Sequence, residues 1–199
     1  TPSAGPASCS LSACGPTVRN ATAPGQAIPR RLAFLPVNAP EGMRVERVAY
    51  LRDAQRRELA NSGIALLNDE AISKTCRSVS CPERGELISR YGADGFFVLD
   101  VESASKNNAL LGYIDQIHGT GRILDGSGKE LFAVENRETE TGGLLFNSGQ
   151  VLEGIKSSVR NYGDDGFNLL AVKFSKSVAL KLPPIKSATA ATGQTRVQN

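Results

Sequence analysis

The sequence contains no tryptophan, and aromatic residues make up only 6% of its 199 positions. Its core must therefore be built mainly from Leu, Ile and Val. No apolar run approaches the ~20 residues that a membrane-spanning helix requires, and the longest runs, such as Phe96–Leu99, have the length of a strand. The formal net charge is only +3, from 23 basic and 20 acidic residues, and no basic run is present. This balance does not favour nucleic-acid binding.

Catalytic signatures are also scarce. His118 is the only histidine, so a Ser-His-Asp or Cys-His arrangement would have to use it, and we expect it on a strand with its side chain in solvent. Asp164 and Asp165 precede a predicted helix and are typical of caps rather than metal ligands. One glycine-rich segment predicts a hairpin, not a phosphate loop, because no Gly-Lys-Ser/Thr follows: Gly119, Gly121, Gly126 and Gly128. We therefore expect no enzymatic activity, no cofactor and no metal site.

The length suits one domain with tails, and 40% hydrophobic residues suffice for a core. Residues 1–30 are rich in Ala, Pro, Ser, Gly and Thr without apolar periodicity, which predicts a flexible tail. Residues 31–184 are expected to form a single α/β domain, and residues 185–199 a disordered tail. Because the sequence starts at Thr1 and not at Met, we expect that a signal peptide has been removed or shortened.

Hydrophobic patterning predicts a mixed β-sheet of about five strands with helices packed against it, in the order β-α-β-α-β-β-β-α-α. The apolar run after Gly95 indicates a central strand that is covered on both faces. Asp125–Gly128 is a hairpin turn signal. The strands are expected at Leu32–Val37, Ile64–Leu67, Gly95–Val101, Tyr113–Leu124 and Glu130–Glu135. The helices are expected before Gly63, between Pro82 and Gly92, at Ser148–Asn161, and from Asp164 or Asp165 to Leu182.

Four cysteines form two closely spaced pairs, Cys9 with Cys14 and Cys76 with Cys81. In an oxidising compartment the second pair predicts a local disulfide, and two unpaired thiols are the alternative. A four-cysteine zinc site is disfavoured because the first pair lies in the expected tail and the spacing is unusual for zinc. A Cys-x-x-Cys redox motif is absent.

The segment Leu11–Gly15 fits a lipobox, in which Cys14 would receive a lipid and become the first residue of the mature chain. An accidental match in an Ala/Ser-rich tail is the alternative. Under the lipobox interpretation, Cys14 is the membrane anchor and the residues up to about Pro29 are a tether.

Two apolar loops stand out near the predicted hairpin strands. The first contains Leu110 and Leu111, and the second contains Leu144, Leu145 and Phe146. One interpretation is that they pack as core under the last two helices. The other is a contact surface for another subunit, a partner or the membrane, since leaving several large apolar side chains in water is costly.

Three stretches resemble parts of the proteins of one bacterial group. Arg56–Leu67 resembles the passage from a helix into the second strand, and Tyr91–Leu99 resembles a Gly-Ala-Asp turn into the central strand. Arg122–Phe132 resembles the hairpin of that group. That group contains the curli export lipoprotein CsgG, the cell-wall synthase activator LpoB, the exopolysaccharide lipoprotein PelC and the TolB amino-terminal domain. Within it, the Gly142–Leu145 loop most resembles an uncharacterised family of bacterial lipoproteins. The resemblance covers Arg31–Pro184 and includes no shared active site.

This resemblance implies a periplasmic lipoprotein, attached to the outer membrane through Cys14. It implies a structural or accessory role in an envelope export or assembly complex. Envelope proteins or further copies of the chain would be the partners, so a homo-oligomer is expected as one arrangement. A protein-binding regulator of a cell-wall synthase is the alternative function.

Overall fold

The computed structural model describes residues 16–20, 28–76, 81, 84–109, 112–143 and 165–183. The strands are β1 (Thr17–Asn20), β2 (Arg31–Phe34), β3 (Ala65–Leu66), β4 (Gly95–Ala109), β5 (Gly112–Asp125) and β6 (Glu130–Gly143). The helices are α1 (Val45–Asn61), α2 (Asp69–Thr75), α3 (Arg84–Ser89) and α5 (Asp165–Leu180). Within these stretches, no helix combines the length and hydrophobicity needed to cross a bilayer. The helix expected at Ser148–Asn161 lies outside the described residues.

The strands form one sheet in the order β1-β6-β5-β4-β2-β3. Strand β2 runs parallel to β3 and β4, and the remaining pairs are antiparallel. The predicted mixed α/β fold is confirmed, with six strands instead of about five. The additional strand is β1, which lies inside the segment expected to be a flexible tail. It pairs antiparallel with the outer edge of β6, where Thr17 lies opposite Glu135.

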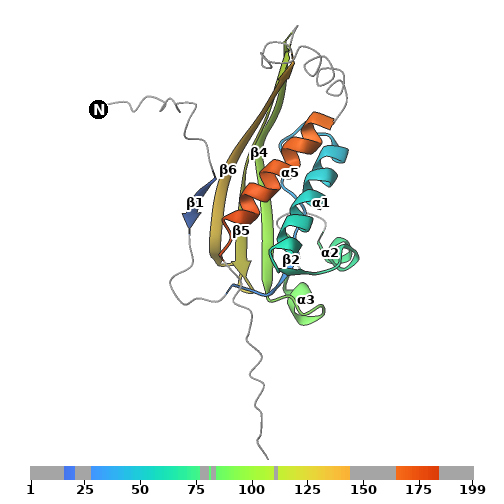
Figure 1. Ribbon diagram of the computed structural model, residues 1–199. Coiled ribbons are helices and arrows are strands. Elements are labelled where there is room, and N and C mark those ends of the chain that lie inside the picture. Colours follow the sequence, from blue (N-terminus) through green and yellow to red (C-terminus); the bar gives the residue numbers. More distant parts are fainter. Residues whose placement is uncertain are drawn as a thin grey trace, which may run out of the picture.

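Helices α1 and α5 lie side by side across one face of the sheet (Figure 1). Helix α1 ends just before Gly63, whose φ of +84° favours glycine. Helix α5 confirms the helix expected from Asp164 or Asp165. The apolar residues that recur along it at helical spacing are buried against the sheet: Phe167, Leu170, Phe174 and Val178. Against them pack Phe34 and Phe97, whose rings meet edge to face with centroids 5.0 Å apart.

Among the described residues, only α2, α3 and the segments that flank them cover the opposite face of the sheet, and they cover it in part. Alternate residues of β2 and β4 point to this side, among them Ala33, Phe96 and Val98, and all three are buried. They pack with Ile72 of α2 and Leu87 of α3. The start of β4 is therefore covered on both faces, as its continuous apolar sequence predicts.

Strands β4 and β6 are longer than the sequence predicts. They were expected to end at Val101 and Glu135, but they continue to Ala109 and Gly143. The far ends of β4, β5 and β6 rise beyond the ends of α1 and α5 (Figure 1). The hydrogen-bonded ladder continues through this polar extension, so pairing and not apolar burial defines the strand ends there.

Candidate functional site

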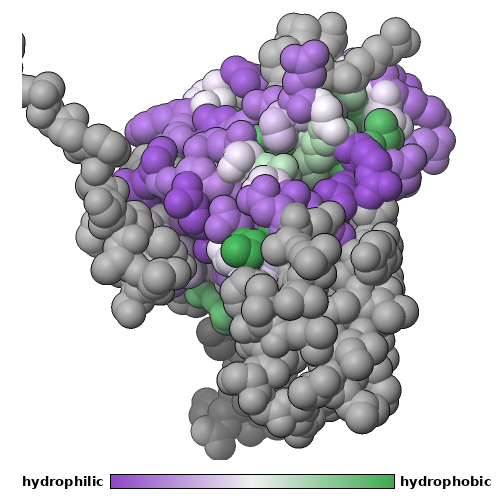
Figure 2. Space-filling view, turned by 90° about the horizontal axis from the view of Figure 1, so that it is seen from above, coloured by the Kyte–Doolittle hydropathy of each residue, from purple (hydrophilic) through white to green (hydrophobic). Residues whose placement is uncertain are grey.

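Charged residues gather on the sheet face that α1 and α5 do not cover, beside α2 and α3. They come from four neighbouring strands, β1, β6, β5 and β4. We call this group the open-face cluster: Arg19, Asp100, Glu102, His118, Thr120, Arg122 and Glu135. Most of these residues line a shallow groove of ≈ 420 Å³. In the view from above, hydrophilic residues dominate the described surface and hydrophobic ones appear in small patches (Figure 2).

A β-bulge builds the centre of the cluster. The register between β4 and β5 shifts between Val101 and Ser103, so that Glu102 is the extra residue. Gly119 lies opposite Val101, and a Cβ atom at this glycine would come within 2.5 Å of the carbonyl oxygen of Asp100. The backbones thus approach more closely here than any other residue type permits. The bulge brings the carboxylate of Glu102 close to the next residues of β5.

His118 lies between two carboxylates. Its Nδ1 is 3.1 Å from Oε2 of Glu102, and its Nε2 is 2.6 Å from Oε1 of Glu135. Its side chain is only 17% exposed, so the expectation of a solvent-exposed histidine is wrong. The reason is the cross-strand geometry, which surrounds the ring with side chains of β4 and β6. Both nitrogens donate hydrogen bonds when the imidazole is protonated, and only one can do so when it is neutral.

Arginines balance the carboxylates on both sides of the histidine. Arg19 of β1 forms an ion pair with Glu135, and Arg122 forms one with Asp100. The hydrogen bond from His118 is the main cause that lowers the pKa of Glu135, and the charge of Arg19 lowers it further. Glu102 also accepts a hydrogen bond from Oγ1 of Thr120 at 3.3 Å. Polar contacts therefore run from Arg19 through Glu135 and His118 to Glu102, and they tie β1 to β6, β5 and β4. The ion pair between Arg122 and Asp100 joins β5 to β4 separately.

The ligand atoms of Glu102, His118 and Glu135 lie within 4.8 Å of one another, as a metal site would require. Their arrangement fits ion pairing better than metal binding. The two carboxylates contact different nitrogens of the same ring, so the donor atoms surround the imidazole and not a common point. A cation would have to displace a ring proton, rotate one glutamate and compete with Arg19 for Glu135.

A second polar group lies on the helix-covered face, toward the far ends of the strands. Lys106, Asp115 and Glu140 are cross-strand neighbours. Asp115 is 2% exposed, and neither carboxylate oxygen accepts a hydrogen bond. Burial raises the pKa of Asp115, and the charges of Lys106 and Arg47 oppose this rise. Glu140 pairs with Lys173 of α5, so the strand extension is fastened to a helix by charge.

Cys76 and Cys81 form a disulfide, with their Cα atoms 4.9 Å apart. Both residues are buried and pack with Ile72 and Leu87. The bond thus joins the end of α2 to the segment before α3, under the helices that cover the start of β4. This buried position indicates that the disulfide has a structural role. Because bonded sulfurs cannot ligate zinc as thiolates, this pair is not available for the four-cysteine site.

The predicted anchor Cys14 and the predicted contact residues Leu110, Leu111, Leu144, Leu145 and Phe146 lie outside the described residues. The structure does place the strand ends that lead into the two apolar loops. Gly112 pairs with Ala109 on one side and with Gly143 on the other. Both loops therefore leave the sheet at the same end, as the sequence order suggested.

Strand pairing between distant segments brings the residues of the open-face cluster together, and the sequence alone does not reveal this pairing. His118 was considered as a catalytic residue, but nothing in the sequence linked it to Glu102 or Glu135. The available signal was weak: alternation places His118, Thr120 and Arg122 on one face of β5. The identity of the opposing residues depends on the β-bulge and on the register.

No protein-family model matches the chain, and no curated protein matches it. Among solved structures, it is similar to a variant of PelC from Paraburkholderia phytofirmans that was crystallised as a dodecamer. That match has 16% identity and a TM-score of 0.51, and it covers 81% of this chain and 95% of the PelC chain. A lipoprotein from Neisseria meningitidis aligns with 16% identity and a TM-score of 0.48, over 67% of this chain and 97% of its own. The likeness to PelC shows a shared fold.

Proposed function

We propose that this chain is a periplasmic lipoprotein, anchored in the outer membrane, that acts as a structural or accessory component of an envelope export or assembly complex. The observation that carries the proposal is the fold shared with PelC, which forms a dodecamer. The lipobox at Leu11–Gly15 supports the anchor, and the disulfide between Cys76 and Cys81 suits an oxidising compartment.

We propose further that the chain is not an enzyme. Its single histidine contacts a carboxylate with each ring nitrogen. A general base needs a nitrogen that is free to take a substrate proton. The charged groups around His118 are paired with one another, and the disulfide excludes Cys76 and Cys81 as nucleophiles. These features support a role in binding and assembly.

The end of the sheet that carries both apolar loops is the proposed contact surface between copies. The far ends of β4, β5 and β6 extend beyond the helices there (Figure 1), so residues at this end have room to meet a neighbour. A closed homo-oligomer would repeat the same contact in every copy. Several large apolar side chains at one end would gain ~1.5–3 kcal/mol each from such burial.

Light scattering of the purified chain, before and after Leu144→Ser together with Leu145→Ser, tests this surface. We expect the wild type to assemble and the double variant to remain a folded monomer. Thr139→Ser with Thr141→Ser, on the exposed face of β6, is the matched control and should assemble normally. If the double variant unfolds, the leucines are core. If it folds and assembles like the wild type, the contact proposal is wrong, and a monomer that co-purifies with one cell-wall synthase would favour the regulator.

Fractionation of cells that express the full precursor tests the anchor. Cys14→Ala should move the protein from the membrane fraction to the soluble fraction, because the thiol that would carry the lipid is lost. Cys9→Ala is the matched control, since it removes the neighbouring cysteine and leaves Cys14. Unchanged partition of the Cys14 variant would rule out the anchor.

A further inference from the structure

Strand β1 fastens the beginning of the chain to the sheet. Thr17 and Val18 pair with Glu135 and Val134 of β6. Arg19 adds the ion pair with Glu135, which also contacts His118. Four residues of the segment expected to be a tether thus belong to the sheet, held by backbone pairing and by charge.

The position of β1 determines how far the predicted anchor can lie from the domain. Cys14 precedes Thr17 by three positions, and an extended chain spans at most ~3.3–3.6 Å per residue, which gives about 10 Å. Without β1, the first packed residue after Cys14 would be Ile28, and the same spacing would allow about 50 Å. Pairing of β1 with β6 therefore shortens the reach of the anchor about fivefold.

We propose that β1 is a clamp that holds the β1–β6 edge of the sheet against a lipid bilayer. This inference rests on the proposed lipidation of Cys14. A diacylglyceryl group lies within the membrane, so a reach of about 10 Å leaves the edge strand at the lipid headgroups. While β1 is paired with β6, the domain has one preferred orientation on the membrane, whereas a chain with a long tether would have many.

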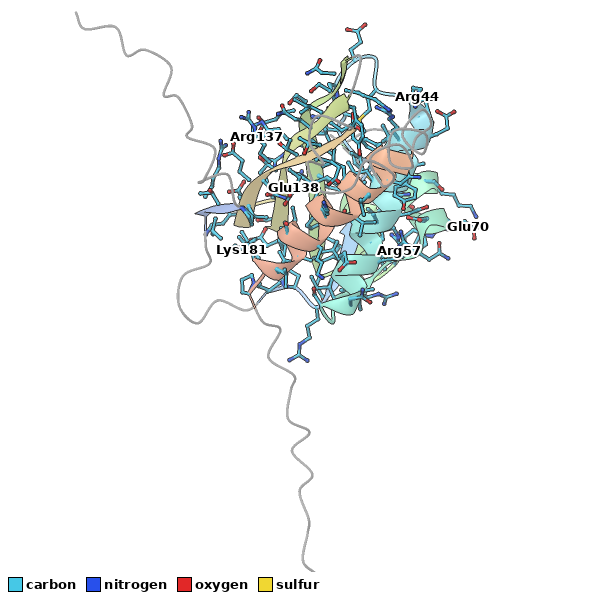
Figure 3. The ribbon with its side chains drawn as sticks, turned by 45° about the horizontal axis from the view of Figure 1, so that its top comes forward. Arg44, Arg57, Glu70, Arg137, Glu138 and Lys181 are labelled. Carbon is cyan, nitrogen blue, oxygen red and sulfur yellow. A yellow bond between two sulfur atoms is a disulfide. The ribbon has the colours of Figure 1, made fainter. Side chains whose placement is uncertain are left out.

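The residues at this edge suit a headgroup surface. Arg19 of β1 is 57% exposed, Arg137 of β6 is exposed, and Val18 of β1 is 39% exposed. Exposed arginines favour contact with anionic lipid headgroups, and Val18, on the other face of β1, adds an apolar side chain at the same edge. Figure 3 shows Arg137 on the sheet side of the molecule and Arg57 of α1 on the opposite side. The bilayer that we propose as the partner would thus meet β1 and β6, with α1 and α2 directed away from it.

Fluorescence quenching measures this orientation. The full precursor with Cys9→Ser is matured in cells, and the lipidated chain is transferred to vesicles of phosphatidylethanolamine and phosphatidylglycerol that carry a headgroup quencher. One dye is attached through Arg137→Cys or, in a second sample, through Arg57→Cys. The disulfide protects Cys76 and Cys81 from the dye. We expect severalfold stronger quenching at position 137 than at position 57.

Proline substitutions then release the clamp. Successive strand amides point to opposite sides, so Thr17→Pro with Val18→Pro removes whichever amide pairs with β6. We expect this variant to stay bound to vesicles and to lose the difference between the two dyes. The matched control, Thr17→Val with Val18→Thr, keeps strand-forming residues and should retain the difference. Far-ultraviolet circular dichroism verifies that both variants keep their helices.

The outcomes separate this inference from the proposal on which it rests. Equal quenching of the two dyes in a chain that carries lipid would overturn the clamp and leave the lipoprotein function intact. An unchanged difference in the proline variant would also overturn it. A mature chain without lipid by mass spectrometry, and without vesicle binding, would remove the anchor and with it both proposals.

Discussion

Strand β4 has two halves that differ in composition but not in pairing. From Gly95 to Val101 its side chains are mostly buried, because helices cover both faces. From Ser103 to Asn107, exposed polar side chains alternate with half-buried ones. Both halves pair continuously with β5, apart from the bulge at Glu102. Apolar content therefore indicates which part of a strand is covered, and backbone pairing determines how far the strand continues.

The largest expected difference between the halves is in side-chain burial. Phe97→Ala should lower the free energy of unfolding by about 3–5 kcal/mol, because it opens a cavity against Phe34 and α5. Ser105→Ala, in the exposed second half of β4, should change it by less than about 0.5 kcal/mol. Urea unfolding measures both values. Equal changes in the free energy of unfolding at the two positions would contradict the conclusion that one half of β4 is covered and the other is not.

The boundary between the halves depends on a single glycine. Gly119→Ala should cost about 3 kcal/mol, the upper end for an overpacked site, because the new Cβ meets backbone and not a flexible side chain. Gly85→Ala in α3 is the control, since nothing lies within 4 Å of its Cβ position. We expect this control to be neutral or slightly stabilising. A small effect at position 119 would show that the bulge can relax.

The cover over the first half of β4 depends on the disulfide. Cys76→Ala with Cys81→Ala should lower the free energy of unfolding by about 2 kcal/mol, the chain-entropy value for so short a loop. Reductant should destabilise the wild type by a similar amount and leave the double variant unchanged. Labelling of both thiols in the native protein without reductant would contradict the bond.

The smallest effect is expected at Asp115 of β5, which lies opposite Lys106 in the second half of β4, and it depends on pH. Because burial raises the pKa of Asp115 in the folded state, ionisation opposes folding. Asp115→Asn should therefore unfold at higher urea concentration than the wild type at pH 7. The difference should shrink as the pH falls toward the usual range of aspartate, where both states bind the proton. A variant that is less stable at pH 7 would indicate that the ionised carboxylate has a stabilising partner.

The elements that the sequence predicts are those that bury an apolar pattern or that depend on contacts between residues close in the sequence. The run Phe96–Leu99 identifies a strand covered on both faces, and the spacing of Phe167, Leu170 and Phe174 identifies α5. The turn at Asp125 is also local: its Oδ1 accepts hydrogen bonds from the backbone amides of Ser127 and Lys129. Such contacts join residues that are close in the sequence, so composition and spacing suffice to predict them.

The elements that the sequence does not reveal depend on distant partners. Strand β1 has no apolar period, and its place follows from pairing with β6. The end of β6 alternates acidic residues with threonine. From α5, Lys173 forms an ion pair with Glu140, and the hydroxyl of Ser177 donates a hydrogen bond to Glu138. His118 was expected in solvent because neither of its carboxylate neighbours is adjacent in the sequence. The open-face cluster therefore forms because the pairing register of β4, β5 and β6 brings its residues together, and this register cannot be predicted from any one segment.

The pairing of β1 with β6 also has a kinetic consequence. The hairpins β4–β5 and β5–β6 join strands that are neighbours in the chain, whereas Thr17 pairs with Glu135, which is far away in the sequence. Short loops close at lower entropic cost, so we expect the hairpins to form early and β1 to join the sheet after them. As a four-residue edge strand it should also be the first element to open in the native state. Attachment of the amino-terminal segment is thus a late and reversible folding step, and hydrogen exchange at Val18 and Arg19 would report it.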